Sequence, residues 1–237
     1  MRHIFCFLPV VVLSISLWSS SFGADRLGKE VDMFFPPPAS SEIVNWKSYS
    51  EDPDAKFNDV WTVVKVNPAK AADNLVICKG SPKGYIYTAR DYTNFVLKLQ
   101  WRWPPGKKPG NGGVLVRMTG KHKIWPKSLE AQINVGDAGD FWGLDGYKFC
   151  GPSERTKSLH HDQFGDLINL KKIKAAEKPP GEWNQYEITV NGPMVTLVIN
   201  GRPINKATGC DVTPGSICLT AEGDEIHFRN VRLRPIK

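Results

Sequence analysis

Short runs of apolar and β-branched residues recur along most of the chain, and Gly, Pro, Asn or Asp bounds each run. Such runs are typical of β-strands, whose successive side chains alternate between two faces. No long stretch repeats its apolar residues with the period of a helix. The pattern predicts strands at 61–66, 74–78, 86–88, 95–103, 113–118, 129–135, 185–190, 195–199, 217–220 and 225–233.

Roughly ten strands within about 190 residues favour two packed antiparallel sheets. Asn191-Gly192 and Asn200-Gly201 are typical of tight hairpin turns. Between 136 and 181 the strand pattern weakens, and polar and aromatic residues replace it. A long polar insertion in a compact domain is more often functional than idle. The fold class we predict is therefore all-β, a two-sheet antiparallel jelly-roll sandwich.

The amino terminus differs from the rest of the chain. A basic start, a short apolar run and small residues at Ser21 and Gly23 are typical of a secretory signal peptide, which we place at 1–23. Residues 24–42 contain Phe34-Phe35 followed by three prolines, which indicates an extended arm. Residues 43–237 form the predicted domain. We expect a periplasmic or secreted protein with no membrane span after the signal is removed.

Charge and cysteine content narrow the function classes. The net charge is +7, but the basic residues are scattered among acidic ones, so we do not expect nucleic-acid binding. Of the five cysteines, Cys6 lies in the predicted signal. The other four permit two disulfides, and Cys210 with Cys218 is a plausible pair because a Pro-Gly turn lies between them. Free buried thiols are the alternative.

Two runs each offer an apolar and a polar face. In 113–118, Arg117 shares a face with Leu115. In 129–135, Glu130, Gln132 and Asn134 share the face opposite the apolar side chains. If the two strands pair, Arg117 can reach the Glu130 carboxylate. An Arg–Glu pair on a solvated sheet face is the simpler explanation, and it would contribute about 0–1 kcal/mol.

Aromatic residues near these strands favour a carbohydrate groove instead. Trp101 and Trp142 are candidate platforms for sugar rings, although a single Trp is more often part of a core. Asp140 and His161, in the insertion, can also contact a substrate. We expect Glu130 to lie in an open, solvent-filled groove on a curved sheet.

Ordinary glycosidases need two carboxylates, and the strand that carries Glu130 offers no second one. Asp137 or Asp140 could provide it from a loop. No cofactor is expected, and no metal is required. Asp137, Asp140 and Asp145 could bind calcium, but hydrated loop carboxylates are the simpler interpretation.

Several motifs together resemble the 3-keto-disaccharide hydrolase domain family, in the family's order over roughly residues 43–236. They are Tyr92-Thr93-Asn94-Phe95-Val96-Leu97, Asn111-Gly112-Gly113-Val114-Leu115-Val116-Arg117, Leu129-Glu130-Ala131-Gln132-Ile133, Pro180-Gly181-Glu182-Trp183-Asn184, Val198-Ile199-Asn200-Gly201, Gly215-Ser216-Ile217-Cys218-Leu219, Glu222-Gly223 and 226–233. The resemblance implies an exported concanavalin-like jelly roll. It also implies action on glycosides whose carbon 3 is oxidised to a ketone.

Such a ketone acidifies the hydrogen on carbon 2, so a base can remove it and the substituent on carbon 1 can leave. The resemblance carries three roles to this chain: Glu130 as base or acid, Arg117 as stabiliser of the enolate oxygen, and Gln132 as the orienting residue. His161 or Asp140 would be a second acid or base, and Asn134, Trp142 and Trp101 would contact the sugar.

The function we predict is cleavage of 3-keto-glycosides or disaccharides by hydrolysis or elimination, with a glycoside or oligosaccharide as the partner. The first alternative is a lectin-like carbohydrate-binding module without catalysis, because this architecture often binds without reacting. The second is a structural surface protein. The sequence leaves the sugar, the linkage and the oligomeric state open.

Overall fold

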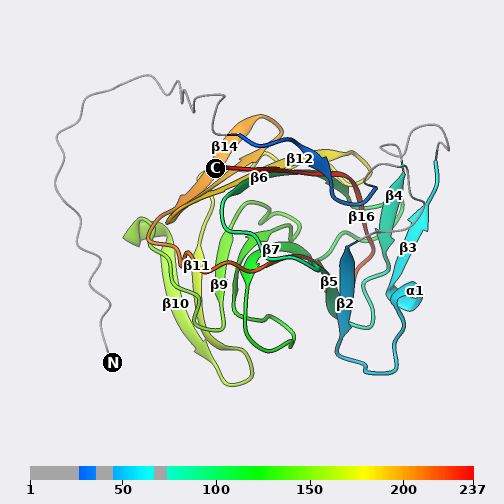
Figure 1. The fold of residues 1–237 in the computed structure, drawn as a ribbon, viewed down its shortest axis with the longest axis horizontal. Coiled ribbons are helices and arrows are strands. Elements are labelled where there is room, and N and C mark those ends of the chain that lie inside the picture. Colours follow the sequence, from blue (N-terminus) through cyan, green and yellow to red (C-terminus); the bar gives the residue numbers. More distant parts are fainter. Residues whose placement is uncertain (1–26, 36–44, 67–73) are drawn as a thin grey trace.

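The computed structural model describes residues 27–35, 45–66 and 74–237. The predicted signal peptide, Cys6 and much of the predicted arm lie outside these residues. In the part that the structure describes, two antiparallel sheets pack face to face, as Figure 1 shows. This confirms the predicted all-β sandwich. The helical segments of the described residues are α1 (Phe57–Val60) and the 3₁₀ turn η3 (Ser153–Arg155).

One sheet, here called the back sheet, has the strand order β14-β13-β12-β6-β16-β4-β3, and β1 pairs with β16. Its strands are β1 (Val31–Asp32), β3 (Trp61–Val64), β4 (Leu75–Cys78), β6 (Phe95–Arg102), β12 (Asn184–Asn191), β13 (Met194–Ile199), β14 (Arg202–Ala207) and β16 (Ile226–Pro235).

The other sheet, here called the front sheet, has the order β10-β11-β9-β8-β7-β15-β5-β2. Its strands are β2 (Trp46–Ser50), β5 (Gly84–Thr88), β7 (Gly113–Met118), β8 (Ser128–Gln132), β9 (Phe141–Leu144), β10 (Thr156–His161), β11 (Gly165–Leu170) and β15 (Ser216–Ala221). The front sheet is curved, with β10 at one end and β2 at the other, and both ends bend away from the back sheet (Figure 1).

The main core lies between the sheets. The front sheet contributes Val114, Val116 and Leu129, which pack with Leu97 and Trp101 of the back sheet. A second apolar cluster covers the other face of the front sheet, here called its outer face. Its buried members are Tyr85, Leu115, Met118, Leu144, Leu167 and Cys218. Because both faces carry apolar side chains, a polar group on the outer face can be enclosed rather than solvated.

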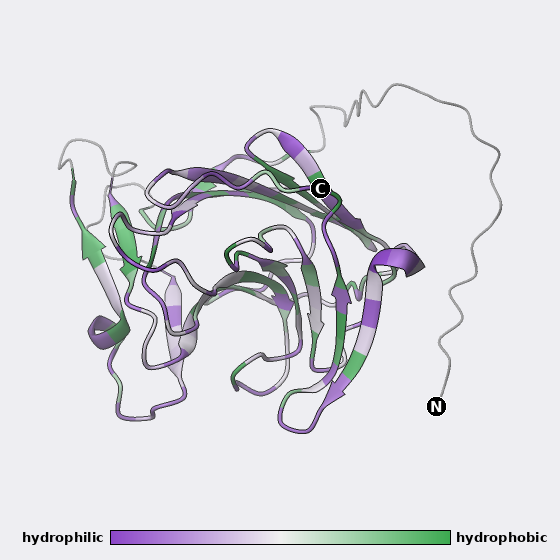
Figure 2. Cartoon of the chain, turned by 180° about the vertical axis from the view of Figure 1, so that it is seen from behind, coloured by the Kyte–Doolittle hydropathy of each residue, from purple (hydrophilic) through white to green (hydrophobic). Residues whose placement is uncertain are grey.

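All ten predicted strands overlap observed ones, but the sequence pattern missed several others. The segment 136–181 is not a loop, since it contains β9, β10 and β11. Strand β10 is almost wholly exposed and mostly hydrophilic (Figure 2), so it lacks the apolar alternation that marks a strand. The predicted Asn200-Gly201 turn is confirmed, with φ of 51° and 75° at its two central residues.

The described part of the arm belongs to the domain. Phe34 is fully buried, and the indole N–H of Trp46 donates to the carbonyl of Met33 at 2.7 Å. Strand β1 continues the back sheet beyond β16, and Leu27 forms a bridge with Ile236. The first described residues therefore lie beside the last ones.

The cysteines correct one prediction. Cys78, Cys210 and Cys218 are free buried thiols, so the suggested Cys210–Cys218 disulfide is wrong. The two residues belong to different apolar clusters, Cys210 to the main core and Cys218 to the outer face. Burial raises the pKa of Cys78 and of Cys210 to about 12, which keeps both thiols protonated. Among the described residues, no helix is long and apolar enough to cross a membrane.

Candidate active site

A β-bulge changes the faces of strand β7. Between the pairs Leu115↔Cys218 and Met118↔Ser216, β7 has one residue more than β15. Arg117 sits in this bulge with φ of 54°, a left-handed conformation. Met118 consequently joins Leu115 on the outer face, and Arg117 leaves the position that strict alternation predicts.

The Arg117 guanidinium binds backbone carbonyls at one end of the sandwich. Its N–H groups donate to the carbonyls of Thr93, Asp211 and Gly192 at 2.6–3.1 Å, and one also lies 3.4 Å from Asn94 Oδ1. Arg117 is 1% exposed. The predicted Arg117–Glu130 ion pair is therefore wrong, because these carbonyls already engage the charged group.

Glu130 lies in the middle of the front sheet, between its cross-strand neighbours Leu115 and Trp142. Its side chain reaches over Gly113, where a Cβ atom would come within 2.0 Å of Glu130 Oε1. Glycine at 113 is thus required for this carboxylate position. Glu130 is only 3% exposed, so the expectation of an open groove around it is wrong. The apolar outer face encloses it.

A second carboxylate, Glu222, directly follows strand β15. Its Oε2 accepts hydrogen bonds from the side-chain amide of Asn111 and, at 3.3 Å, from the indole N–H of Trp125. The neighbouring Thr220 Oγ1 accepts the backbone N–H of Gly113 at 2.6 Å. The structure thus supplies beside Glu130 the partner carboxylate that its own strand lacks. We call Glu130 and Glu222 the carboxylate pair.

The environment of the pair favours its protonated forms. Burial raises the pKa of Glu130 well above its ordinary value, and the negative charge of Glu222 raises it further. Burial also raises the pKa of Glu222, although hydrogen bonds from Thr220 and Trp125 oppose the shift. Carboxyl groups tuned in this way are common among catalytic acids and bases.

Three buried oxygens at this place have no hydrogen-bond partner among the described residues: Glu130 Oε1, Glu222 Oε1 and Asn111 Oδ1. Buried polar atoms in proteins are almost always satisfied. An unsatisfied cluster of acceptors therefore indicates a place where a proton donor or a positive charge belongs.

The loop between β7 and β8 covers the pair. Trp125 in this loop has φ of 55° and packs on Phe164 with ring centroids 4.3 Å apart, and Phe164 packs on His161 at 4.5 Å. A cavity of about 10 Å³ remains against Glu222, Thr220 and Trp125. That space suits one water molecule, so a sugar ring can reach Glu222 only when the loop moves.

The same loop is held from the other side by tyrosines. His122 Nδ1 is 2.8 Å from the Tyr85 hydroxyl, and the His122 ring lies 4.5 Å from that of Tyr87 and 5.7 Å from that of Tyr49. Burial and the charge of Lys47 lower the pKa of His122. The loop therefore spans the outer face between two aromatic clusters, one on each side of the carboxylate pair.

The other predicted site residues lie at several different places in the structure. Trp142 is Glu130's cross-strand neighbour and packs against the outer-face cluster. Gln132 ends β8, and its side-chain oxygen accepts the backbone N–H groups of Ile133 and Asn134. Asn134 itself lies beyond the strand. His161 is exposed at the end of β10. Their roles stay predictions.

Two of the predicted residues have structural surroundings. Trp101 is fully buried in the main core against Tyr186, so it is not a surface platform for a sugar. Asp140 is also fully buried, but it pairs with Lys171 at 2.8 Å and accepts the backbone N–H of Lys172 at 2.9 Å. We call Asp137, Asp140, Lys171 and Lys172 the lysine cluster.

The three aspartates considered for calcium are engaged with lysines. Asp137 lies 3.2 Å from Lys171, and Asp145 lies 2.9 Å from Lys123. Among the described residues, no three His, Cys, Asp or Glu side chains gather as metal ligands. These loop carboxylates therefore form ion pairs instead of a shared site.

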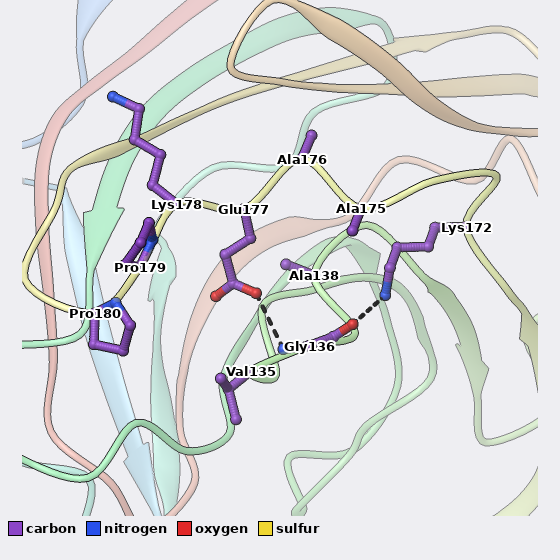
Figure 3. Close-up of a pocket in the computed structure, with 10 residues that line it drawn as sticks. All are labelled: Val135, Gly136, Ala138, Lys172, Ala175, Ala176, Glu177, Lys178, Pro179 and Pro180. Carbon is purple, nitrogen blue, oxygen red and sulfur yellow. Dashed lines mark hydrogen bonds between the residues drawn. The ribbon is translucent and has the colours of Figure 1, made fainter.

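A larger cavity, of about 330 Å³, lies at the end of β8 next to the lysine cluster (Figure 3). Glu177 points into it and accepts the N–H groups of Gly136 at 3.1 Å and Trp103 at 3.3 Å. Both oxygens of the Glu177 carboxylate therefore already have partners, unlike those of the carboxylate pair. The carboxylate pair is the better candidate.

The comparison with family models decides the relationship. The model described as the 3-keto-alpha-glucoside-1,2-lyase-like domain matches residues 41–234. The chain belongs to this family. The match spans both sheets of the sandwich and includes Asn111, Glu130 and Glu222. It confirms the resemblance found in the sequence.

Solved structures with the same fold come from several sources. Two candidate glycosyl hydrolases from Parabacteroides distasonis are 22% and 17% identical, with TM-scores of 0.57 and 0.54. The alignments cover 88% and 82% of this chain, and 100% and 90% of theirs. Carbohydrate-binding module CBM66 from Bacillus subtilis is 11% identical with a TM-score of 0.51, over 79% of this chain and 94% of that one. These identities show the shared jelly-roll fold alone. No curated protein matches the chain.

Sequence reasoning missed the partner of Glu130 in this lyase-like domain. Glu222 and Asn111 both stand in motifs that carry the family resemblance, but neither lies on the strand of Glu130. A usable signal was available in the strand pairing. Asn111 lies two residues before Gly113 in β7, and Glu222 lies two residues after Thr220 in β15. Gly113 and Thr220 face the same side of these two adjacent strands. Only the strand order brings them together.

Proposed function

We propose that the protein is a carbohydrate-active enzyme that cleaves 3-keto-glycosides, with Glu130 as the proton-transfer residue. The observation that carries this proposal is the buried Glu130, with Glu222 beside it, on the outer face of a domain of the 3-keto-alpha-glucoside-1,2-lyase-like family. The two Parabacteroides proteins are described as candidate glycosyl hydrolases, which agrees with a glycoside substrate, although their likeness extends to the fold alone.

The chemistry needs one base of raised basicity. A ketone at carbon 3 makes the carbon-2 hydrogen acidic, but it stays a weak acid. Glu130 without its proton is a stronger base than an exposed carboxylate, since burial and Glu222 raise its pKa. Glu130 takes the proton from carbon 2, and the electron pair of the C–H bond forms the enolate. The enolate then expels the oxygen on carbon 1, and the proton held by Glu130 is available to that departing oxygen.

The cover over the pair fits this chemistry. Water would compete for the base and return a proton to the enolate, and a closed apolar site excludes it. Trp125 donates to Glu222, and its loop must swing away for the substrate ring to enter. We propose that Trp142, the neighbour of Glu130 on the same face, then contacts the sugar.

The test is turnover of a 3-keto-glucoside by the full domain and by Glu130→Gln. Loss of a general base lowers turnover by about 10²–10⁴-fold. The matched control is Glu177→Gln, which changes a partly buried carboxylate outside the site. Equal turnover by wild type and Glu130→Gln would contradict the assignment. Unchanged sugar affinity with no turnover by either protein would favour the lectin-like binding module.

We also propose export. A basic start, a short apolar run and small residues at Ser21 and Gly23 support a signal peptide at 1–23. Intact mass of protein recovered from the periplasm or medium tests this, since cleavage after Gly23 leaves Ala24 as the first residue. A full-length mass there would contradict the cleavage.

A further inference from the structure

The side-chain amide of Asn111 carries the most informative unsatisfied atom in the molecule. Its Nδ2 donates to Glu222, which fixes the orientation of the amide, because the opposite orientation would place its oxygen against the carboxylate. Asn111 Oδ1 is buried with no partner among the described residues. A carboxyl oxygen can be satisfied by holding a proton, but an amide oxygen only accepts. It needs a donor or a cation.

Strand pairing explains why the three unsatisfied oxygens share one place. Strands β7 and β15 are paired, and Asn111 precedes the first while Glu222 follows the second. The bond from the Gly113 N–H to Thr220 Oγ1 holds the two strand ends together. Glu130 reaches the same spot from β8 because Gly113 has no side chain. Three adjacent strands therefore each contribute one oxygen ligand.

We propose that Asn111, Glu130 and Glu222 form a binding site for one divalent cation. The donor set is two carboxylates and an amide, with the Thr220 hydroxyl beside them and neither His nor Cys. Hard oxygen sets of this kind suit Ca²⁺, Mg²⁺ or Mn²⁺ instead of the softer transition metals. The two carboxylates match the charge of such an ion, and in the described residues neither one forms an ion pair with Lys or Arg.

The role of the ion rests on the proposed function. The enolate oxygen needs a positive group, and Arg117, expected in that role, is bound to carbonyls elsewhere. A cation held chiefly by Glu222 and Asn111 would face Glu130 and could accept the ketone oxygen as a further ligand.

The test measures binding without any sugar. The full domain, treated with a chelator and desalted, is titrated with Ca²⁺, Mg²⁺ and Mn²⁺ by calorimetry. Terbium(III), which replaces calcium at oxygen sites, gives an optical readout, since Trp125 next to Glu222 can sensitise its emission. We expect one ion per chain. Glu222→Gln and Asn111→Ala should each weaken binding at least about tenfold.

Asp137→Asn is the control, because Asp137 is an exposed acidic residue of the lysine cluster and should leave ion affinity unchanged. Trp125→Phe should keep calcium binding and lose most of the sensitised terbium emission. No binding at millimolar concentrations of the three ions would overturn the inference. So would binding that neither Glu222→Gln nor Asn111→Ala weakens.

Turnover separates this inference from the proposed function. Cleavage of a 3-keto-glucoside in chelator, together with no ion binding, refutes the cation site and leaves Glu130 as the proton-transfer residue. Ion binding lost in Glu222→Gln, with no turnover of any 3-keto-glycoside by wild type, supports the site and refutes the substrate.

Discussion

Asp140 of the lysine cluster and Glu130 of the carboxylate pair are almost equally buried, but they have different partners. Asp140 is 0% exposed and Glu130 is 3% exposed. Asp140 has Lys171 at 2.8 Å and a backbone N–H at 2.9 Å. Glu130 has an unsatisfied oxygen and a second carboxylate for a neighbour. Burial alone therefore does not distinguish a structural carboxylate from a functional one; the partners do.

The contrast follows from what each location needs. Asp140 lies between β8 and β9 and binds the chain just after β11. It therefore links two segments that would otherwise separate. On the outer face, Glu222 binds Asn111 and Trp125, but one oxygen of each carboxylate has no partner among the described residues, and this is destabilising. Proteins retain such strained polar groups mainly at sites of function.

Arg117→Ala should have the largest effect on stability. Arg117 belongs with Asp140 in this comparison, because its guanidinium donates to carbonyls of three separate backbone segments. Removing it leaves buried carbonyls unpaired, and we expect a loss of about 3–5 kcal/mol in the free energy of unfolding. Urea denaturation measures this. An Arg117→Ala protein that is as stable as wild type but has impaired turnover would support a catalytic role for Arg117.

Asp140→Asn and Glu130→Gln should change stability in opposite directions. Asp140→Asn breaks a buried ion pair, at a cost of about 2–4 kcal/mol, since Lys171 is partly solvated. Glu130→Gln removes a buried acidic group that has no cationic partner, and it adds donors beside unsatisfied oxygens. It should be neutral or stabilising by about 1 kcal/mol. The melting temperatures of the two variants and of wild type, measured in chelator, test this. Equal destabilisation by the two substitutions would contradict the difference between the regions.

The two regions should also respond oppositely to pH. The pKa of Glu130 is raised in the native state. Its stabilising contribution to the free energy of unfolding is therefore fully present below the ordinary value of 4.5, and it is lost as pH rises through the native pKa. Partial burial opposes ionisation of Asp137, but Lys171 and Lys172 outweigh it and lower the pKa. Its contribution is present above 3.8 and is lost as pH falls.

Unfolding curves between about pH 2 and 8 in chelator test this for wild type, Glu130→Gln and Asp137→Asn. Glu130→Gln should flatten the decline toward high pH. Asp137→Asn should flatten the decline toward low pH. Identical pH profiles for all three proteins would show that neither carboxylate contributes as the structure indicates.

Asp137→Asn at neutral pH should have the smallest effect. The Asp137 side chain is 43% exposed, so solvent screens its interactions with the two lysines. A loss below about 0.5 kcal/mol is expected, within the range for exposed ion pairs. A loss as large as that of Asp140→Asn would mean that the lysine cluster acts as one unit.

Most of the fold could be predicted from alternation, and its failures have physical causes. Strands such as β6 and β12 alternate strictly between buried and more exposed positions, so the sequence shows them. Strand β10 is polar because solvent covers most of it. Strand β9 is short and contains Gly143, where a side chain would collide with the carbonyl of Tyr147. Local sequence does not contain that contact.

The site could be predicted only in part, for two reasons. Glu130 was identified because strand pairing is a short-range inference, and β7 does pair with β8. Arg117 was misplaced because one extra residue in β7, invisible to alternation, moves it off its expected face. Glu222 was missed because it lies about ninety residues beyond Glu130, on a strand whose position in the sheet follows only from the complete topology.

The bridge between Leu27 and Ile236 has a practical consequence. Both ends of the described chain meet on β16, in the sheet farther from Glu130 and Glu222. A short linker could join them into a continuous ring, and new termini could then be opened at an exposed turn such as Asn200-Gly201. Immobilised on a bead through either end of the described chain, the domain would turn the face that carries Glu130 and Glu222 toward the liquid.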